Sequence, residues 1–197
     1  ANEIYKEKNF KKSNKNDDWL GRGIYFYNNI NNAILYNIRK YKNNNHIYPT
    51  YKELSDSRKI LVVNVKYNED TIIDFNEINN LRKLLGLWKI FIDRFKDCEE
   101  YAKLKFKDGF VINWMFDNTD FFEGCQIIKN IFDLDLRFNR KIDELFDRKT
   151  RIGYNLNQEF FCIINEECIE NINIYNENYE DNYEIIKDFT NNILMGG

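Results

Sequence analysis

Apolar and polar residues alternate along some stretches of the chain and follow helical spacing along others, and these patterns predict its elements. Strands are predicted at 24–27, 60–65, 160–164 and 168–175, which are rich in β-branched and aromatic residues. A further short strand is expected at 71–74. The stretch 60–65, ILVVNV, is nearly all apolar, so we expect it to be a central strand of the sheet.

Helices are predicted where apolar side chains return every three or four residues. The clearest helix runs over 74–97, and Asp74 with Glu77 is the expected capping box at its start. Residues 111–116 fit either a strand or a helix, and a turn of helix is expected near Tyr51. Shorter helices are expected at 1–10, 33–41, 98–105, 120–132, 142–146 and 183–194.

The order of these elements predicts the fold class. They form no internal repeat and no linker separates them, so we expect one compact α+β domain over residues 1–197. Its core would be a split mixed or antiparallel sheet flanked by helices. A hydrophobic content of 43% in 197 residues is sufficient for such a core.

Charge is spread unevenly, although the net charge is only −3. Residues 1–60 hold 12 Lys and Arg against 6 Asp and Glu, whereas residues 151–197 hold 2 against 9. A basic front half is compatible with a nucleic-acid-binding module, but no recognition helix accompanies it. We therefore keep nucleic-acid binding only as the third functional hypothesis.

Cysteine spacing and hydropathy exclude other classes of protein. The four cysteines form no CxxC pair, so we expect neither a zinc site nor a disulfide framework. No apolar run approaches the ~18 residues that a membrane span requires. We expect a cytoplasmic protein without a membrane partner.

The most informative stretch is DDWLGRGIYFYNNINNAILY, residues 17–36. Gly21 and Gly23 bracket Arg22 just before a β-prone run, a pattern typical of backbone with unusual φ or of backbone that approaches something closely. Tyr25 lies on the expected strand, and Tyr36 follows eleven residues later on the expected helix. Such a turn, strand and helix can fold two tyrosines around a flat ligand, and packing of both tyrosines in the core is the alternative.

Two ordered motifs resemble one enzyme family. GRGIYF with a second tyrosine eleven residues after the first resembles the nicotinamide pocket of ADP-ribosyltransferases of the diphtheria-toxin and poly(ADP-ribose) polymerase type, named for a His-Tyr-Glu triad. NQEFFCIIN at 157–165 is similar to the glutamate-led strand that closes this pocket. ANEIYKEKNF at 1–10 resembles the family helix that precedes the glycine motif. The resemblance reaches from residue 1 to about 175, with little motif support between 59 and 149.

The resemblance implies an ADP-ribosyltransferase-like fold and a mono-ADP-ribosyltransferase that uses NAD as its substrate. Glu159 and Tyr36 would be the catalytic residues, and Tyr25 and Tyr36 would sandwich the nicotinamide. Gly23 would keep the backbone low beneath the ligand, and Arg22 would reach a phosphate. We therefore predict that Tyr25, Tyr36 and Glu159 converge on one cleft, whereas a water-facing glutamate at a strand edge is the alternative for Glu159.

The same resemblance implies partners. The acceptor would be a macromolecule, either protein or nucleic acid, and a bacterial toxin or defence effector of this type could have a neutralising or regulatory partner protein. A catalytically inactive member of the fold, which binds NAD or a partner protein, is the second hypothesis.

If the register of the glutamate strand is shifted by one residue, Gln158 takes the place of Glu159. The chain departs from the family pattern at two points, of which the first is Ala33, where the family has a hydroxyl. The single histidine, His46, is expected in an exposed polar loop. The family histidine belongs on a strand upstream of residues 1–10, so we expect that this strand is missing.

Overall fold

A computed structural model describes residues 4–5, 10–13, 15, 18–104, 107–132, 158–175, 180 and 183–184. The chain divides into two compact units, which we describe separately. The first unit takes in Ala1–Phe10, Tyr27–Val65 and Ile169–Gly197, and the second takes in Lys11–Phe26 and Lys66–Cys168. The expectation of one domain over residues 1–197 stays a prediction.

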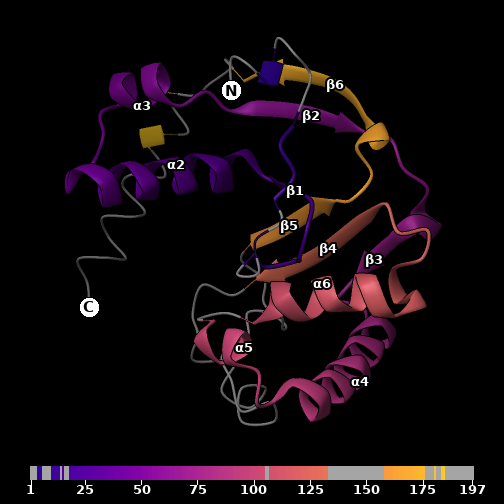
Figure 1. Ribbon diagram of the computed structural model, residues 1–197. Coiled ribbons are helices and arrows are strands. Elements are labelled where there is room, and N and C mark those ends of the chain that lie inside the picture. The colour runs from indigo at the N-terminus through magenta and orange to yellow at the C-terminus, as the bar shows by residue number, and fades with distance from the viewer. Residues whose placement is uncertain are drawn as a thin grey trace. The chain divides into compact units, whose positions relative to one another are not determined.

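A four-stranded mixed sheet organises the second unit (Figure 1). Its strand order is β1 (Ile24–Tyr27), β5 (Gln158–Ile163), β4 (Ile127–Phe132) and β3 (Ile72–Asp74). β3 runs parallel to β4, and β4 runs antiparallel to β5. The first three residues of β1 belong to this unit, so the glycine motif and the Glu159 strand lie side by side although they are far apart in sequence.

Helices pack beside this sheet. α4 (Ile78–Phe95) buries Leu81, Leu84, Trp88 and Phe91 at the spacing of one helical face. It packs against α6 (Asp108–Asn118), where the rings of Phe91 and Trp114 meet edge to face at 5.3 Å. The short elements of this unit are η1 (Glu69–Thr71), α5 (Glu99–Lys103), η2 (Asp120–Phe122) and η3 (Glu166–Cys168).

The first unit joins helices to a two-stranded sheet. β2 (Leu61–Val65) pairs with β6 (Ile169–Ile174) in antiparallel register. α2 (Ile30–Asn45) and α3 (Tyr51–Ser57) contribute Ile34, Ile38 and Leu54 to a core that also contains Ile60 and Tyr183. The Tyr183 hydroxyl donates a hydrogen bond to the Pro49 carbonyl.

The α+β class and the flanked mixed sheet are confirmed, and so are the strands near 24–27, 71–74, 160–164 and 168–175. The helix expected over 74–97 is α4, and the ambiguous stretch 111–116 lies in α6. The helix expected at 33–41 is α2, which begins earlier because the Asn29 side chain accepts the Asn31 N–H at 2.7 Å and caps it.

Three predictions were wrong. Residues 120–132 do not form a helix; they form η2 and then the strand β4. The stretch 60–65 lies in the two-stranded sheet, with Val62 exposed, so it is not a central strand. The capping box of α4 does not form, because Asp74 bonds Asn76 instead, and Glu77 makes no side-chain cap.

Some predicted elements fall wholly or mainly outside the described residues. They are the helices at 1–10, 142–146 and 183–194. Of these ranges, residues 4, 5, 183 and 184 are described in helical conformation, and residue 10 is described outside a helix. Along the described ranges, no helix has both the length and the apolar character needed to cross a bilayer.

Candidate functional site

Residues 20–25, here called the glycine turn, are held together by the Tyr25 hydroxyl. This hydroxyl accepts the Leu20 N–H at 2.8 Å and donates to the Gly21 carbonyl at 2.5 Å. Burial is the main reason that the pKa of Tyr25 is raised, so the phenol stays neutral. Gly21 has a φ of +74°, a left-handed conformation that glycine adopts without a steric penalty.

Gly23 marks a close approach between the glycine turn and β5. A Cβ at this position would lie 2.3 Å from the Cys162 sulfur and 2.9 Å from the Ile163 carbonyl oxygen. The sequence motif correctly indicated a close approach, and in this unit the neighbour of Gly23 is a strand. Its predicted place beneath a ligand stays a prediction.

Arg22 is bound to α6. Its backbone N–H donates to the Asn113 side-chain oxygen at 2.7 Å, and its guanidinium lies 2.8 Å from the Asp117 carboxylate. The guanidinium carbon also lies 5.0 Å from the centre of the Phe116 ring. Because the guanidinium is about half exposed, it keeps access to solvent while it makes these contacts.

The directions of Tyr25 and Glu159 follow from strand alternation. A Cβ at Gly23 would point toward the Cys162 sulfur. The side chain of Tyr25, two residues further on, therefore points to the same face of the sheet as Cys162. Glu159 is three residues before Cys162 on β5, so its side chain leaves the sheet on the opposite face. Neighbouring strands thus carry both residues, but on different faces of this sheet.

Three charged side chains from adjacent strands meet on the face of Glu159, and we call them the charged cluster: Asp74, Lys129 and Glu159. The Lys129 ammonium lies 2.7 Å from the Glu159 carboxylate and 3.3 Å from that of Asp74. Asp74 is the register partner of Lys129, whereas Glu159 is its diagonal neighbour. The three side chains are only 19–29% exposed, so solvent screens their charges incompletely.

The electrostatics of the charged cluster favour an ionised Lys129. Its pKa is raised, first by the hydrogen bond to Glu159 and then by the charge and hydrogen bond of Asp74, while burial opposes the shift. The Lys129 ammonium also lies 5.9 Å from the centre of the Phe161 ring. Two carboxylates and one ammonium leave the charged cluster with one net negative charge.

Tyr36 lies on α2 in the first unit, with 46% of its surface exposed. Its ring centre is 6.0 Å from that of Tyr27, and the Lys40 ammonium lies 5.6 Å from the Tyr36 ring centre. Tyr36 therefore lies at the surface of its unit between these two neighbours. Tyr36 belongs to one unit and Glu159 to the other, so their convergence on one cleft stays a prediction. Tyr25 and Glu159 share a unit but lie on opposite faces of its sheet, which does not bring these two side chains together.

The remaining sequence candidates have local roles. His46 ends α2 with a φ of +60°, and its backbone N–H donates to the Lys42 carbonyl at 2.7 Å. It is exposed, as predicted for a loop histidine. Ala33 packs against the core of the first unit. Gln158 is the first residue of β5, directly before Glu159.

Sequence analysis missed the roles of Asp74 and Lys129. Asp74 was interpreted as a helix cap and Lys129 as part of a helix. The available signal was Lys129 itself, a charged residue between Ile127–Ile128 and Ile131, because a charge inside an apolar strand needs partners. The partners could not be named without the register of the sheet.

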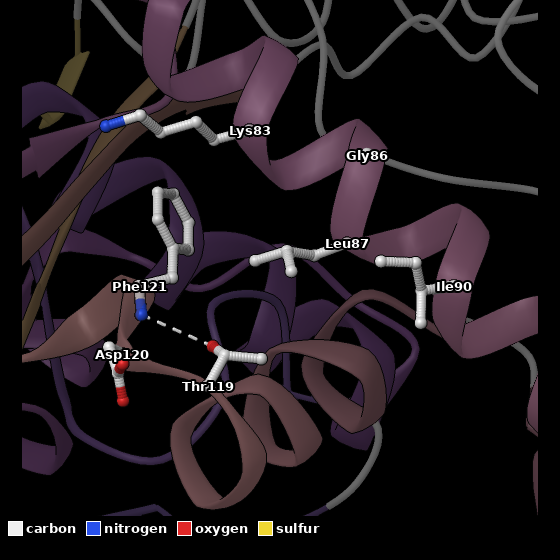
Figure 2. Close-up of a pocket in the computed structure, with 7 residues that line it drawn as sticks. All are labelled: Lys83, Gly86, Leu87, Ile90, Thr119, Asp120 and Phe121. Atoms are coloured by element: carbon white, nitrogen blue, oxygen red, sulfur yellow. Dashed lines mark hydrogen bonds between the residues drawn. The ribbon is translucent and has the colours of Figure 1, made fainter.

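A shallow groove of about 540 Å³ lies in the same unit, between α4 and the segment after α6 (Figure 2). The Phe121 N–H donates to the Thr119 hydroxyl at 3.3 Å on one side of it. No residue of the glycine turn or the charged cluster lines the groove. Its lining residues are Lys83, Gly86, Leu87, Ile90, Thr119, Asp120 and Phe121.

Comparison with known proteins identifies a relative but no family. No family model matches the chain. The "Uncharacterized protein MJ0359" of Methanocaldococcus jannaschii is 26% identical over 153 residues, which is 73% of this chain. The match spans 64% of that protein, less than two thirds of its length. No solved structure matches.

Proposed function

We propose that this protein is a mono-ADP-ribosyltransferase that transfers ADP-ribose from NAD to a macromolecular acceptor. The observation that carries the proposal is the pairing of β1 with β5 in one sheet. The two motifs that resemble the family, GRGIYF and the glutamate-led strand, are thereby neighbours in space although the sequence separates them widely. This adjacency supports an ADP-ribosyltransferase-like fold.

Glu159 is the proposed catalytic carboxylate. In the transfer, the bond between the nicotinamide nitrogen and the ribose C1 breaks, and its electron pair leaves with nicotinamide. A nucleophile of the acceptor then bonds to C1 and releases its proton. Positive charge develops on the ribose in the transition state, and a nearby carboxylate stabilises this charge. The net negative charge of the charged cluster suits this role, because a half-buried negative site attracts a developing cation.

Tyr36 is the proposed aromatic contact of the nicotinamide, because its ring is half exposed. The resemblance also assigns Tyr25 to the nicotinamide, Gly23 to the backbone beneath it and Arg22 to a phosphate. These three residues already have contacts within the second unit. NAD binding would therefore depend more on Tyr36 than on the glycine turn.

The second candidate function is an inactive module of the same fold that binds NAD or a partner protein. The position of His46 is the observation behind it, since this histidine ends α2, lies in no strand and does not match the family histidine. A member of the fold with an incomplete triad could retain binding and lose transfer. The two candidates differ in whether label from NAD reaches an acceptor.

The test is to incubate the protein with NAD labelled in its ADP-ribose part and with cell extract, and to follow label in macromolecules. Protease or nuclease treatment of the labelled material then identifies the acceptor as protein or nucleic acid. Glu159→Gln keeps the size of the side chain and removes its charge, so transfer should fall ~100-fold or more while NAD binding persists.

Glu170→Gln is the matched control, because Glu170 is an exposed glutamate on β6, and it should transfer as the parent does. Transfer by Glu159→Gln within about twofold of the parent, a difference under ~0.5 kcal/mol, would remove Glu159 from the mechanism. Gln158 would then be tested next. Binding of NAD by the parent without any transfer would favour the inactive module.

A further inference from the structure

Lys129 lies between Asp74 and Glu159 and contacts both carboxylates. Its ammonium reaches one oxygen of Glu159 at 2.7 Å and one oxygen of Asp74 at 3.3 Å. The contacts come from strands on both sides of β4, because β4 lies between β3 and β5. Lys129 is thereby held from two directions, and it links the carboxylates of two strands that do not pair with each other.

Asp74 is itself fixed by Asn76. The other oxygen of Asp74 accepts the Asn76 backbone N–H at 2.8 Å and the Asn76 side-chain amide at 2.6 Å. The Asn76 side-chain oxygen accepts the Ile131 N–H at 3.2 Å, which ties it to β4. One carboxylate oxygen of Asp74 is therefore occupied, and the other is directed to Lys129.

This arrangement differs from an ordinary surface ion pair. An exposed pair moves freely and contributes little to stability. Here the three charged side chains are 19–29% exposed and sit on adjacent strands. Without Lys129, Asp74 and Glu159 would be two like charges on one face of the sheet, and their repulsion would turn Glu159 away.

We propose that Lys129, anchored by Asp74, is the positioning residue of Glu159 in the transfer reaction. This inference rests on the proposed function. Lys129 holds one oxygen of Glu159 and thereby fixes the plane of its carboxylate relative to the sheet. The reacting ribose then meets a carboxylate whose direction is already set, so Lys129 acts through Glu159 and does not need to touch the substrate.

The kinetic test compares Lys129→Met with Lys129→Arg. Methionine removes the charge at a similar length, so kcat for transfer should fall at least ~10-fold while KM for NAD changes less than about threefold. Arginine restores a cation that can bridge two carboxylates, so kcat should return to within about threefold of the parent. Lys89→Met on the exposed face of α4 is the matched control and should change neither constant.

A second readout does not depend on turnover. The titration of the Lys129 ammonium, followed by NMR, should shift to lower pH in Glu159→Gln, because Glu159 is the largest cause of its raised pKa. Asp74→Asn should shift it in the same direction. An unchanged Lys129 titration in both variants would overturn the proposal, since the contacts would then be absent in solution.

The outcomes separate this inference from the proposed function. If the parent transfers ADP-ribose and Lys129→Met retains the parent kcat, only the positioning role is wrong. If Lys129→Met folds but has a lowered kcat, and Lys129→Arg has a kcat that is just as low, then the positive charge does not position Glu159. The proposal is also wrong in that case. If the parent transfers nothing from NAD, the proposed function fails, and the positioning role fails with it.

Discussion

The glycine turn and the charged cluster belong to one sheet, yet they use their polar groups differently. In the glycine turn, Tyr25, Arg22 and Gly23 each make contacts that hold the second unit together. In the charged cluster, three charges gather on a half-buried face and leave one net negative charge. The first set of residues surrounds a buried turn, whereas the second set gathers charges where solvent still reaches them.

The comparison shows that a residue can be essential for the stability of the fold or for the turnover of substrate. A change in the glycine turn should lower the free energy of unfolding, and a change in the charged cluster should lower turnover at nearly constant stability. A glycine-turn variant with lower turnover at constant stability would show that the turn contacts the substrate. A charged-cluster variant with lower stability would show that the cluster holds the fold together.

Gly23→Ala should have the largest effect on stability. The new methyl group would meet the Cys162 sulfur and the Ile163 carbonyl at separations well below van der Waals contact. Overpacking of this kind costs about 1–3 kcal/mol, which urea unfolding would measure. Gly86→Ala is the matched control, because its methyl group meets nothing within 4 Å on α4, and it should be neutral or slightly stabilising.

Tyr25→Phe should cost about 1 kcal/mol of unfolding free energy or more. The aromatic ring stays, but the Leu20 N–H loses its acceptor at a buried residue. Tyr36→Phe serves as the comparison, since its exposed hydroxyl makes only a 3.5 Å contact with Lys40. Equal stabilities of the two variants would contradict a structural role for the Tyr25 hydroxyl.

Tyr36→Ala tests whether a residue of the first unit contributes to NAD binding. Loss of an aromatic ring that stacks on nicotinamide should weaken NAD binding by about 1 kcal/mol, or roughly fivefold in Kd. Titration calorimetry would measure this change, and the unfolding free energy should move less because the ring is half exposed. Unchanged NAD affinity would exclude Tyr36 from the binding site.

Arg22→Ala should have the smallest effect. Its ion pair with Asp117 is about half exposed on both sides, so we expect a loss of about 0.5 kcal/mol that shrinks further at high salt. A double-mutant cycle with Asp117→Ala would isolate the pair. A large loss of NAD affinity in Arg22→Ala would instead give this arginine the phosphate contact that the resemblance implies.

Sequence patterns predicted α4 well and β4 wrongly, and the reason is physical. In α4, the buried positions Leu81, Leu84, Trp88 and Phe91 recur every three or four residues, a spacing that a helix gathers on one face. In β4, the pair Ile127–Ile128 and the later Ile131 also fit a helical period. Both members of the pair are buried because β4 is an inner strand with two covered faces.

The sequence predicted candidate residues only where a short stretch of sequence determines their position. The close approach at Gly23 and the strand that bears Glu159 were visible in the sequence. Lys129 and Asp74 were not, because their partnership depends on the parallel register of β3 with β4, which no short-range pattern specifies. The exposed position of Val62 likewise depends on which strand becomes the partner of β2.

The buried thiol of Cys162 allows local opening of the sheet to be measured. This thiol projects from β5 against the glycine turn and is fully buried, and burial raises its pKa well above the ordinary value. Alkylating reagents attack the thiolate, so Cys162 reacts only when β1 and β5 separate. Cys98, which is partly exposed, reacts without such an event. The ratio of the two alkylation rates in native buffer would therefore report how often this part of the sheet opens, without any engineered label.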